Sequence, residues 1–329
     1  MFTRPADVDD ADVVGVLSEG WGLGVVDLDY LAVGFGSHHW RATTASASWF
    51  VTVDDLVAKC HEPSELLLGT RERLVAALTT AAALRDAGFD FVVAPIRTND
   101  DRIAANIGDR YVVAVYPNLD GETYDYGNYS DAAHRDSVLR HLATLHRAPT
   151  SCRRWALTDT FSIPRRAALH AACSQLEDRW TFGPFAEPAR CLLARHVDAM
   201  VHAFDKYDAL AAAASSQPSR FALTHGEPHP ANTITIDRGV VLVDWDTALI
   251  APPERDLWDL VGEEPSVSIQ YEDLTGIGVD HDAIELYRLK WDLSEIAIYI
   301  SDFRQAHDQT DDTHEAWNNL QHFLDPTRW

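Results

Sequence analysis

The sequence predicts an α+β protein in two parts: a small antiparallel β-sheet with one helix, then a larger, mainly helical part that carries a β-hairpin. Three observations support this class. The first third of the chain is rich in β-branched and aromatic runs, turn-forming residues gather at 117–121, and helical periodicity dominates beyond them. We therefore predict an N-terminal lobe of residues 1–117 and a C-terminal lobe of residues 118–329.

The sheet predicted for the N-terminal lobe has five strands. Each strand is a short apolar or aromatic run that ends at glycine or acidic turn residues. One helix is predicted over 64–87, where leucines recur at helical spacing until Gly88. The predicted strands are 30–33, 40–44, 48–53, 89–96 and 110–116.

The C-terminal lobe is predicted to be helical except for one hairpin. Ser130 is a typical N-cap residue, and apolar residues at helical spacing follow it. The residues Asp237-Arg238-Gly239 form a hairpin turn between two β-branched runs. In chain order, the predicted elements are a helix over 130–147, two or more helices within 164–215, hairpin arms at 233–236 and 240–243, and a helix over 282–306.

Charge and composition exclude several classes of partner. The formal net charge is −24, from 27 Lys and Arg against 51 Asp and Glu. A groove for nucleic-acid phosphates, or a surface for anionic lipid, would work against this charge, so we expect neither partner. The four cysteines form no closely spaced pair, which argues against a disulfide framework or a thiolate zinc site. The acidic N-terminal residues do not resemble a signal peptide, and no apolar run reaches the roughly 20 residues of a membrane-spanning helix, so we expect a soluble cytoplasmic protein.

The predicted hairpin brings two oxygen ligands together. Asn232 precedes the first arm and Asp244 follows the second, so antiparallel pairing places them side by side. An amide oxygen beside a carboxylate suits Mg²⁺, which binds one or two carboxylates together with phosphate oxygens. Glu227, five residues before Asn232, can accept a proton from an attacking hydroxyl. With a glycine turn elsewhere to lie over phosphates, these residues indicate a phosphoryl-transfer site.

The same segments resemble the aminoglycoside phosphotransferase and choline kinase superfamily, the small-molecule kinases that share the protein-kinase fold. The family pattern is H-G-D-x-x-x-x-N, then I-D-W/F, then a segment like R-D-L/I-A, and the order of the lobes extends the resemblance over nearly the whole chain. The matching residues are His225-Gly226-Glu227 with Asn232, Val243-Asp244-Trp245-Asp246, Arg255-Asp256-Leu257, and the helical segment from Leu142 to His146.

This resemblance implies a role for each matched residue, with Mg²⁺ as cofactor and ATP or GTP as co-substrate. In the C-terminal lobe it assigns the catalytic carboxylate to Glu227, the Mg²⁺ ligands to Asn232, Asp244 and Asp246, and the support of the loop to His225 and Asp256. In the N-terminal lobe it assigns nucleotide binding to Gly34, Gly36, Ser37, His38, Thr52, Lys59, Val115 and Tyr116.

Two positions depart from the family pattern. Glu227 stands where the family usually has Asp, and the extra methylene moves the carboxylate by about an ångström, which can cost on the order of 10² in rate unless the loop adjusts. Family members also carry a phosphate-gripping lysine on the third strand, where this chain has Thr52. Lys59 is the only lysine nearby; His38 or Arg41 could supply the charge instead, or the site has no such charge.

Acidic residues are concentrated at the C-terminal end of the chain. Residues 244–329 contain 20 acidic and 5 basic residues. On the predicted helix 282–306, carboxylates form a stripe beside the apolar face, which indicates either a solvated surface or the wall of a cleft for a cationic substrate. For the second interpretation the candidate substrate-binding residues are Glu263, Glu264, Asp292, Glu295 and Tyr299.

From the sequence we therefore expect an enzyme that transfers a phosphoryl group from ATP or GTP to a hydroxyl of a small, cationic, aminocyclitol-like antibiotic, giving resistance or self-protection. Two alternatives stay open. One is a kinase of an endogenous metabolite such as a sugar, a choline-like alcohol or a nucleoside. The other is a kinase-fold binding module without turnover. The expected partners are the nucleotide and the small substrate, and the expected state is a monomer or homodimer.

Overall fold

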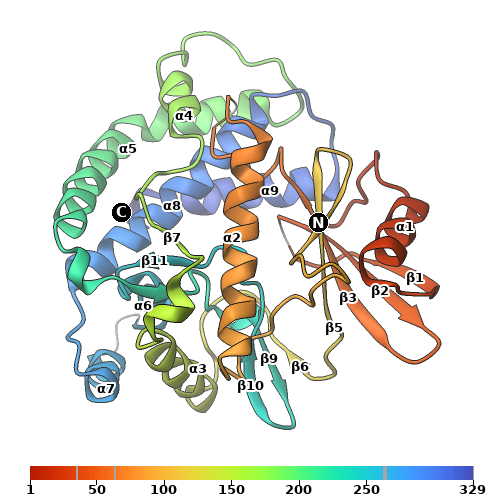
Figure 1. Cartoon of the computed structure of the whole chain (residues 1–329). Helices are drawn as coiled ribbons and strands as arrows, with labels where there is room; N and C mark the ends of the chain where they lie inside the picture. Colours follow the sequence, from red (N-terminus) through yellow and green to blue (C-terminus); the bar gives the residue numbers. More distant parts are fainter. Residues whose placement is uncertain (35, 63, 262–264, 329) are drawn as a thin grey trace.

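The computed structural model describes residues 1–34, 36–62, 64–261 and 265–328 (Figure 1). The N-terminal lobe contains a five-stranded antiparallel sheet with the strand order β1-β2-β3-β5-β4. Two helices accompany this sheet. The elements are α1 (Asp10–Trp21), β1 (Val25–Leu31), β2 (His38–Thr44), β3 (Ser48–Asp55), α2 (Leu67–Asp86), β4 (Ala105–Ile107) and β5 (Tyr111–Pro117).

Two predictions for this lobe are wrong. Helix α1 was not expected; Asp9 caps it in a capping box with Asp12, and its apolar face packs on the sheet. The segment 89–96 is not a strand of the sheet. Its backbone bonds to β10 in the other lobe, through Val93 N to Leu242 O at 3.0 Å, and at its end Ile96 N donates to Val115 O of β5 at 2.7 Å. Ala105–Ile107 takes the edge of the sheet as β4.

The C-terminal lobe is helical around two small sheets. The predicted hairpin is present, and a two-residue strand from the lobe junction extends it to the order β10-β9-β6. A second sheet has the order β7-β11-β8; β7 and β8 come before the hairpin in sequence, and β11 comes after it. The elements are β6 (Glu122–Thr123), α3 (Ala132–Leu145), β7 (Leu157–Thr158), α4 (Arg166–Cys173), α5 (Ala186–Ser215), β8 (Ala222–Thr224), β9 (Thr233–Ile236), β10 (Gly239–Leu242), β11 (Leu249–Ala251), α6 (Glu254–Val261), α7 (Pro265–Thr275), α8 (His281–Phe303) and α9 (Asp311–Phe323).

Helix α2 lies between the two lobes (Figure 1). One of its faces, with Leu74 and Leu78, packs in a cluster with β5 residues of the N-terminal sheet. Another face, with Ala77, Ala81 and Leu84, belongs to the core of the C-terminal lobe around α3 and Trp245. The two-lobed α+β class is therefore confirmed, and the predicted junction falls where β5 ends, at Pro117.

None of the helices within the described ranges combines the length and the apolar character that crossing a membrane requires.

Candidate active site

The β9–β10 hairpin brings Asn232 beside the start of the Asp244 segment. The amide of Val243 donates to the carbonyl of Asn232 at 3.0 Å, one residue beyond the last ladder pair. Asp244 has φ 61°, a left-handed backbone conformation that L-residues rarely adopt, so the chain turns sharply where the strand ends. The predicted juxtaposition of the two residues is therefore present in the backbone.

The carboxylates of Asp244 and Asp246 lie within hydrogen-bonding contact of each other; Asp246 is half-buried, whereas Asp244 is exposed. Desolvation and the charge of Asp246 raise the pKa of Asp244 well above its usual range. Desolvation acts in the same direction on Asp246, but the ammonium of Lys59 outweighs it and keeps the pKa of Asp246 low. Two carboxylates this close compete for one proton, so a cation between them is favourable.

Mg²⁺ fits the donor set of this site. In the described ranges no group of three or more carboxylate, imidazole or thiol side chains gathers as for a fully protein-bound metal. The site offers the two carboxylates and the side-chain amide of Asn232. The Nδ2 of this amide donates to the carbonyl of Glu227 at 3.0 Å, so the amide oxygen is available to a cation. Mg²⁺ commonly binds one or two carboxylates and completes its shell with water and phosphate oxygens.

The loop that carries Glu227 is held by a buried carboxylate on α6. Asp256 accepts the backbone amides of His225 at 2.9 Å and Gly226 at 2.6 Å, and the Nε2 of His146 lies 3.0 Å away. Burial works against ionisation of Asp256, but the His146 contact and nearby Arg255 outweigh it, so its pKa is lowered. The supporting position predicted for Asp256 matches these contacts, and His146, at the end of α3, is the partner of this carboxylate.

His225 connects the two halves of the site. Its Nε2 lies 2.8 Å from the carbonyl of Val243, and its Nδ1 accepts the amide of Glu227 at 3.3 Å. Burial lowers the pKa of His225, so the ring is neutral, with the proton on Nε2. One imidazole thus fixes the distance between the Glu227 backbone and the segment that leads to Asp244.

The Glu227 side chain faces a pocket, and no hydrogen bond or ion pair to it occurs in the described part of the chain. Burial, reinforced by Asp246, raises the pKa of Glu227 to about 7. The guanidinium of Arg255 opposes this shift and packs against Gly226, where a Cβ would lie 2.2 Å from its Nη2. Gly226 has φ 109°, so the position requires glycine for both backbone and space. A carboxyl with a pKa near neutrality suits general-base chemistry.

Lys59 lies in the turn that follows β3 and reaches the site from there. Its ammonium is 2.6 Å from Asp246 and 3.2 Å from Asp54. Burial alone would lower the pKa of Lys59, but the carboxylates of Asp246 and Asp54 outweigh it and raise the pKa well above the usual value. Asp54, at the end of β3, turns inward and pairs with Lys59, so carboxylates from both lobes hold the ammonium at the site.

The glycine turn lies over this ammonium. A Cβ on Gly36, which has φ 82°, would lie 4.0 Å from the Nζ of Lys59. Ser37 donates its hydroxyl to Asp54 at 2.5 Å, which fixes the end of the turn. Gly34, with φ 66°, is the other left-handed glycine, and a Cβ there would lie 3.5 Å from Nε2 of His39.

His38 does not point toward the glycine turn. It is buried on the opposite face of β2, with Nδ1 3.2 Å from the hydroxyl of Tyr30, so alternation along the strand turns its neighbour His39 to the turn instead. Burial lowers the pKa of His39 to about 3, which makes it a neutral neighbour of the ammonium of Lys59. The side chain that reaches the glycine turn is therefore His39 and not the predicted His38, because the strand begins at residue 38 rather than at residue 40.

The remaining nucleotide-binding candidates lie on β3 and β5. Thr52 pairs with His39 and Ala114 across the sheet. The carbonyl of Val115 accepts the amide of Ile96 at 2.7 Å, and the Val115 side chain is in the sheet core, so neither group is available to a nucleotide. Tyr116 is half-buried near the carboxylates, and desolvation together with Asp54 raises its pKa well above the usual value.

The acidic stripe on α8 is largely neutralised within the protein. Asp292 is fully buried and its Oδ1 lies 2.8 Å from Nη2 of Arg328, so it is not a cleft wall. Tyr299 packs near Phe323 and donates to Glu295 at 2.6 Å. Of the predicted substrate-binding residues only Glu295 lies near Glu227, whose pKa it helps to raise. Glu263 and Glu264 lie outside the described residues.

A small pocket beside Glu227 is lined by residues that the sequence analysis did not select. Trp258 and Asp259 come from α6, Trp291 from α8, and Tyr126 from the loop before α3. The rings of Tyr126 and Trp291 are nearly parallel, at 15°, with centroids 6.3 Å apart. Trp291 stands one helical turn before Glu295, so the helix predicted to supply an acidic wall supplies an aromatic one.

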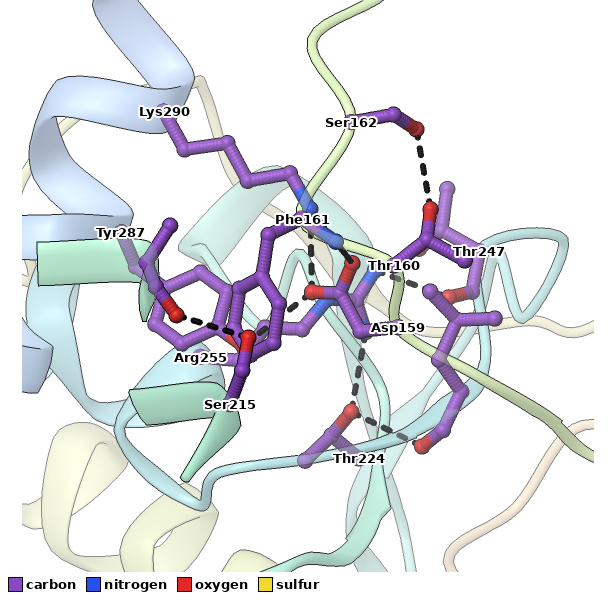
Figure 2. Close-up of polar contacts among 12 residues, drawn as sticks. Asp159, Thr160, Phe161, Ser162, Ser215, Thr224, Thr247, Arg255, Tyr287 and Lys290 are labelled. Atoms are coloured by element: carbon purple, nitrogen blue, oxygen red, sulfur yellow. Dashed lines mark hydrogen bonds and ion pairs between the residues drawn. The ribbon is translucent and has the colours of Figure 1, made fainter. Parts of the chain in front are cut away.

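A second polar cluster lies beside Arg255, the residue that packs against Gly226 of the catalytic loop (Figure 2). Asp159 pairs with Lys290 through both carboxylate oxygens, at 2.8 and 2.9 Å, and accepts the hydroxyl of Tyr287 at 3.1 Å. Arg255 lies beside it and donates to Thr224 and to the carbonyl of residue 247. Lys290 is therefore committed to Asp159, and Lys206 pairs with Glu285 on the surface, which leaves Lys59 as the lysine at the site.

Comparison with known proteins is consistent with this geometry. The model of a family described as the phosphotransferase enzyme family matches residues 34–287. Protein StrN from Streptomyces griseus is 28% identical over 258 residues, which cover 74% of this chain and 75% of StrN. Spectinomycin phosphotransferase APH(9)-Ia, solved in complex with ADP and spectinomycin, is similar with a TM-score of 0.73 at 16% identity, covering 98% of this chain and 100% of that chain. Choline kinase LicA from Streptococcus pneumoniae has a TM-score of 0.55 at 17% identity, over 96% of this chain and 98% of that chain. The two structures establish the kinase-like fold.

Proposed function

Because the chain belongs to the phosphotransferase enzyme family, and is therefore a small-molecule kinase, we propose that it phosphorylates a hydroxyl of a cationic, aminocyclitol-like antibiotic with ATP or GTP as donor. The observation that carries the proposal is the Glu227 carboxylate, which lines a pocket, has no hydrogen bond or ion pair within the described residues, and lies close enough to Asp246 for their charges to interact. The bound spectinomycin of the structural neighbour supports an antibiotic as the class of acceptor.

In the proposed reaction Glu227 orients the acceptor hydroxyl and accepts its proton at a carboxylate oxygen. The new P–O bond forms as the bond between the γ-phosphorus and the β–γ bridging oxygen breaks, and the nucleoside diphosphate leaves with that oxygen. Lys59 and the glycine turn hold the phosphates of the donor, and Asp256 and His225 keep the loop in register with Asp244. Asn232, Asp244 and Asp246 would hold Mg²⁺, which would supply positive charge to the phosphates of the donor. The protein thus acts through position and charge, which carry most of the catalysis in phosphoryl transfer.

Mass spectrometry tests this function directly. The purified protein is incubated with ATP or GTP, Mg²⁺ and a panel of amino-sugar, aminocyclitol, peptide and nucleoside antibiotics, with choline and simple sugars as metabolite controls. One added phosphoryl group on an aminocyclitol supports the proposal. Glu227→Ala should lower the rate by roughly 10²–10⁴, while Glu227→Asp, which restores the usual family residue, should keep much of it.

The two alternatives give different results in the same assay. Phosphorylation of metabolites but not of any antibiotic would identify a metabolic kinase. Nucleotide binding without product across the whole panel would identify a binding module and would refute the catalytic role of Glu227.

A further inference from the structure

The pocket beside Glu227 is narrow in this structure. Its free space is about 10 Å³, room for about one water molecule, although its walls include the proposed base and two indole rings. An acceptor molecule can therefore reach Glu227 only if part of the wall moves. The wall segments on α6 and α8 belong to packed helices, whereas Tyr126 lies in a loop without regular secondary structure between β6 and α3.

The loop around Tyr126 is fixed by hydrogen bonds at both sides, and in the middle the Tyr126 side chain is held by ring contacts with Trp291 and His229. Before it, the hydroxyl of Tyr124 bonds to Thr235 on the hairpin at 2.7 Å; after it, the hydroxyl of Tyr129 donates to the carbonyl of Pro228 in the catalytic loop. Tyr126 itself is 60% exposed and has no hydrogen bond in the described part of the chain. Gly127 follows with φ 134° and no atom within 4 Å of a Cβ position, so the backbone can turn there.

The surfaces that Tyr126 covers are suited to a cation. Its ring faces Trp291, and Trp258 packs on Trp291 with centroids 5.8 Å apart. Aromatic faces attract an ammonium group through their quadrupole, most strongly when water is excluded. Asp259 has no ion pair or hydrogen bond in the described ranges, and burial raises its pKa to about 6. A carboxylate in this state gains most from a cationic partner.

Two buried N–H groups of the same pocket also lack partners. The indole Nε1 of Trp291 and the Nδ1 of His229 accept or donate no hydrogen bond in the described structure. Nε2 of His229 lies 3.3 Å from the amide nitrogen of Asn232, so it acts as the acceptor and the ring proton stays on Nδ1. Buried donors of this kind are normally satisfied, so these two indicate oxygen atoms on the bound molecule.

We propose that Tyr126 is an aromatic lid that determines specificity: it closes over the acceptor so that an ammonium group lies against Tyr126 and Trp291 with Asp259 as its counter-ion. The substrate class is a compact amine that also carries hydroxyl or ether oxygens for Trp291 and His229. This inference rests on the proposed function for the identity of the pocket as the acceptor site, but its test does not require turnover.

The test uses tryptophan fluorescence of the full-length protein, with choline and its neutral isostere 3,3-dimethylbutan-1-ol as probes. Choline should quench the emission and bind at least tenfold more tightly than the isostere. Tyr126→Ala should weaken choline binding about tenfold, or about 1.4 kcal/mol, Tyr126→Phe should keep it, and Asp259→Asn should remove most of the preference for the cation. Phe182→Ala, which removes a 44% exposed aromatic ring outside the pocket, should change nothing.

Equal binding of the two probes, or choline binding that Tyr126→Ala leaves intact, overturns the proposal. For an acceptor that the antibiotic panel identifies, the lid also requires that Tyr126→Ala raise the KM of the acceptor about tenfold while the KM of ATP stays constant. Failure of the proposed function is a different result: it appears as no phosphorylated product from the wild-type protein, whatever the probes do.

Discussion

Replacing Lys59 with methionine should destabilise the protein and make its stability depend on Mg²⁺. The Lys59 ammonium lies 2.6 Å from Asp246 and 3.2 Å from Asp54, and the three side chains are 20%, 18% and 4% exposed. Removing one partner from buried ionic contacts costs about 3–5 kcal/mol, because the remaining charge is left without compensation. At about 2 °C per kcal/mol for a protein larger than 250 residues, the thermal midpoint should fall by roughly 6–10 °C.

Mg²⁺ should restore part of this loss. The variant retains Asp244 and Asp246 without the ammonium that competes with a metal for them, so a divalent cation binds more tightly to the folded state and raises its stability. Thermal unfolding is followed by circular dichroism in EDTA and at millimolar Mg²⁺. The midpoint of Lys59→Met should rise with Mg²⁺ more than that of the wild type.

Lys206→Met is the matched control. This lysine pairs with Glu285 on the surface, where its side chain is 51% exposed, so its loss should cost less than about 1 kcal/mol and should not respond to Mg²⁺. If the two variants unfold within about 2 °C of each other, or if Lys59→Met shows no response to Mg²⁺, Lys59 does not balance the charge of the carboxylate cluster.

Three further outcomes are expected. Glu227→Gln should stabilise the metal-free protein by about 3 kcal/mol near pH 8 and by almost nothing near pH 4, as measured by urea unfolding. The reason is that the pKa of Glu227 is raised from 4.5 to about 7 in the folded protein, so the ionised carboxyl destabilises the folded state increasingly as the pH rises between those values. An equal effect at both pH values would contradict this. Gly226→Ala should lose more stability and activity than Gly239→Ala. Both residues have φ near 110°, but only a Cβ on Gly226 would meet the guanidinium of Arg255, at 2.2 Å. Comparable thermal midpoints for the two variants would show that the contact with Arg255 does not matter. Arg328→Ala should lower the free energy of unfolding by about 3–5 kcal/mol, because it leaves the buried Asp292 without its ion-pair partner. Adding Asp292→Asn should recover part of the lost stability. No recovery would mean that Arg328 acts through packing alone.

The sequence predicted the parts of the molecule whose geometry is local. Asn232 and Asp244 are placed by one hairpin turn, so the ladder between them follows from a short stretch of sequence. The long helix over 282–306 was also predicted nearly in full, because its apolar periodicity is strong. Helix α1 carried a signal that the strand-rich interpretation passed over: Val13, Leu17 and Trp21 recur every four residues.

The other differences depend on contacts between distant segments. The acidic stripe was read as a free face because its partners are far away in sequence, Arg165 for Asp302 and Arg328 for Asp292. The aromatic pocket depends on Tyr126 and Trp291, which lie on different elements, and no local pattern links them. The segment 89–96 has the composition of a strand, but its middle bonds to β10 in the other lobe, and it reaches the N-terminal sheet through Ile96 at its end.

Helix α2 has a consequence for how the two lobes can be separated. Since its alanine face completes the C-terminal core and its leucine face completes the N-terminal one, a cut at the junction after Pro117 would leave Ala77, Ala81 and Leu84 facing water. The segment that follows the helix is also hydrogen-bonded across the junction to β10. An isolated N-terminal fragment would therefore tend to aggregate. A chimera that exchanges one lobe for that of another kinase would need an α2 whose two faces fit both lobes.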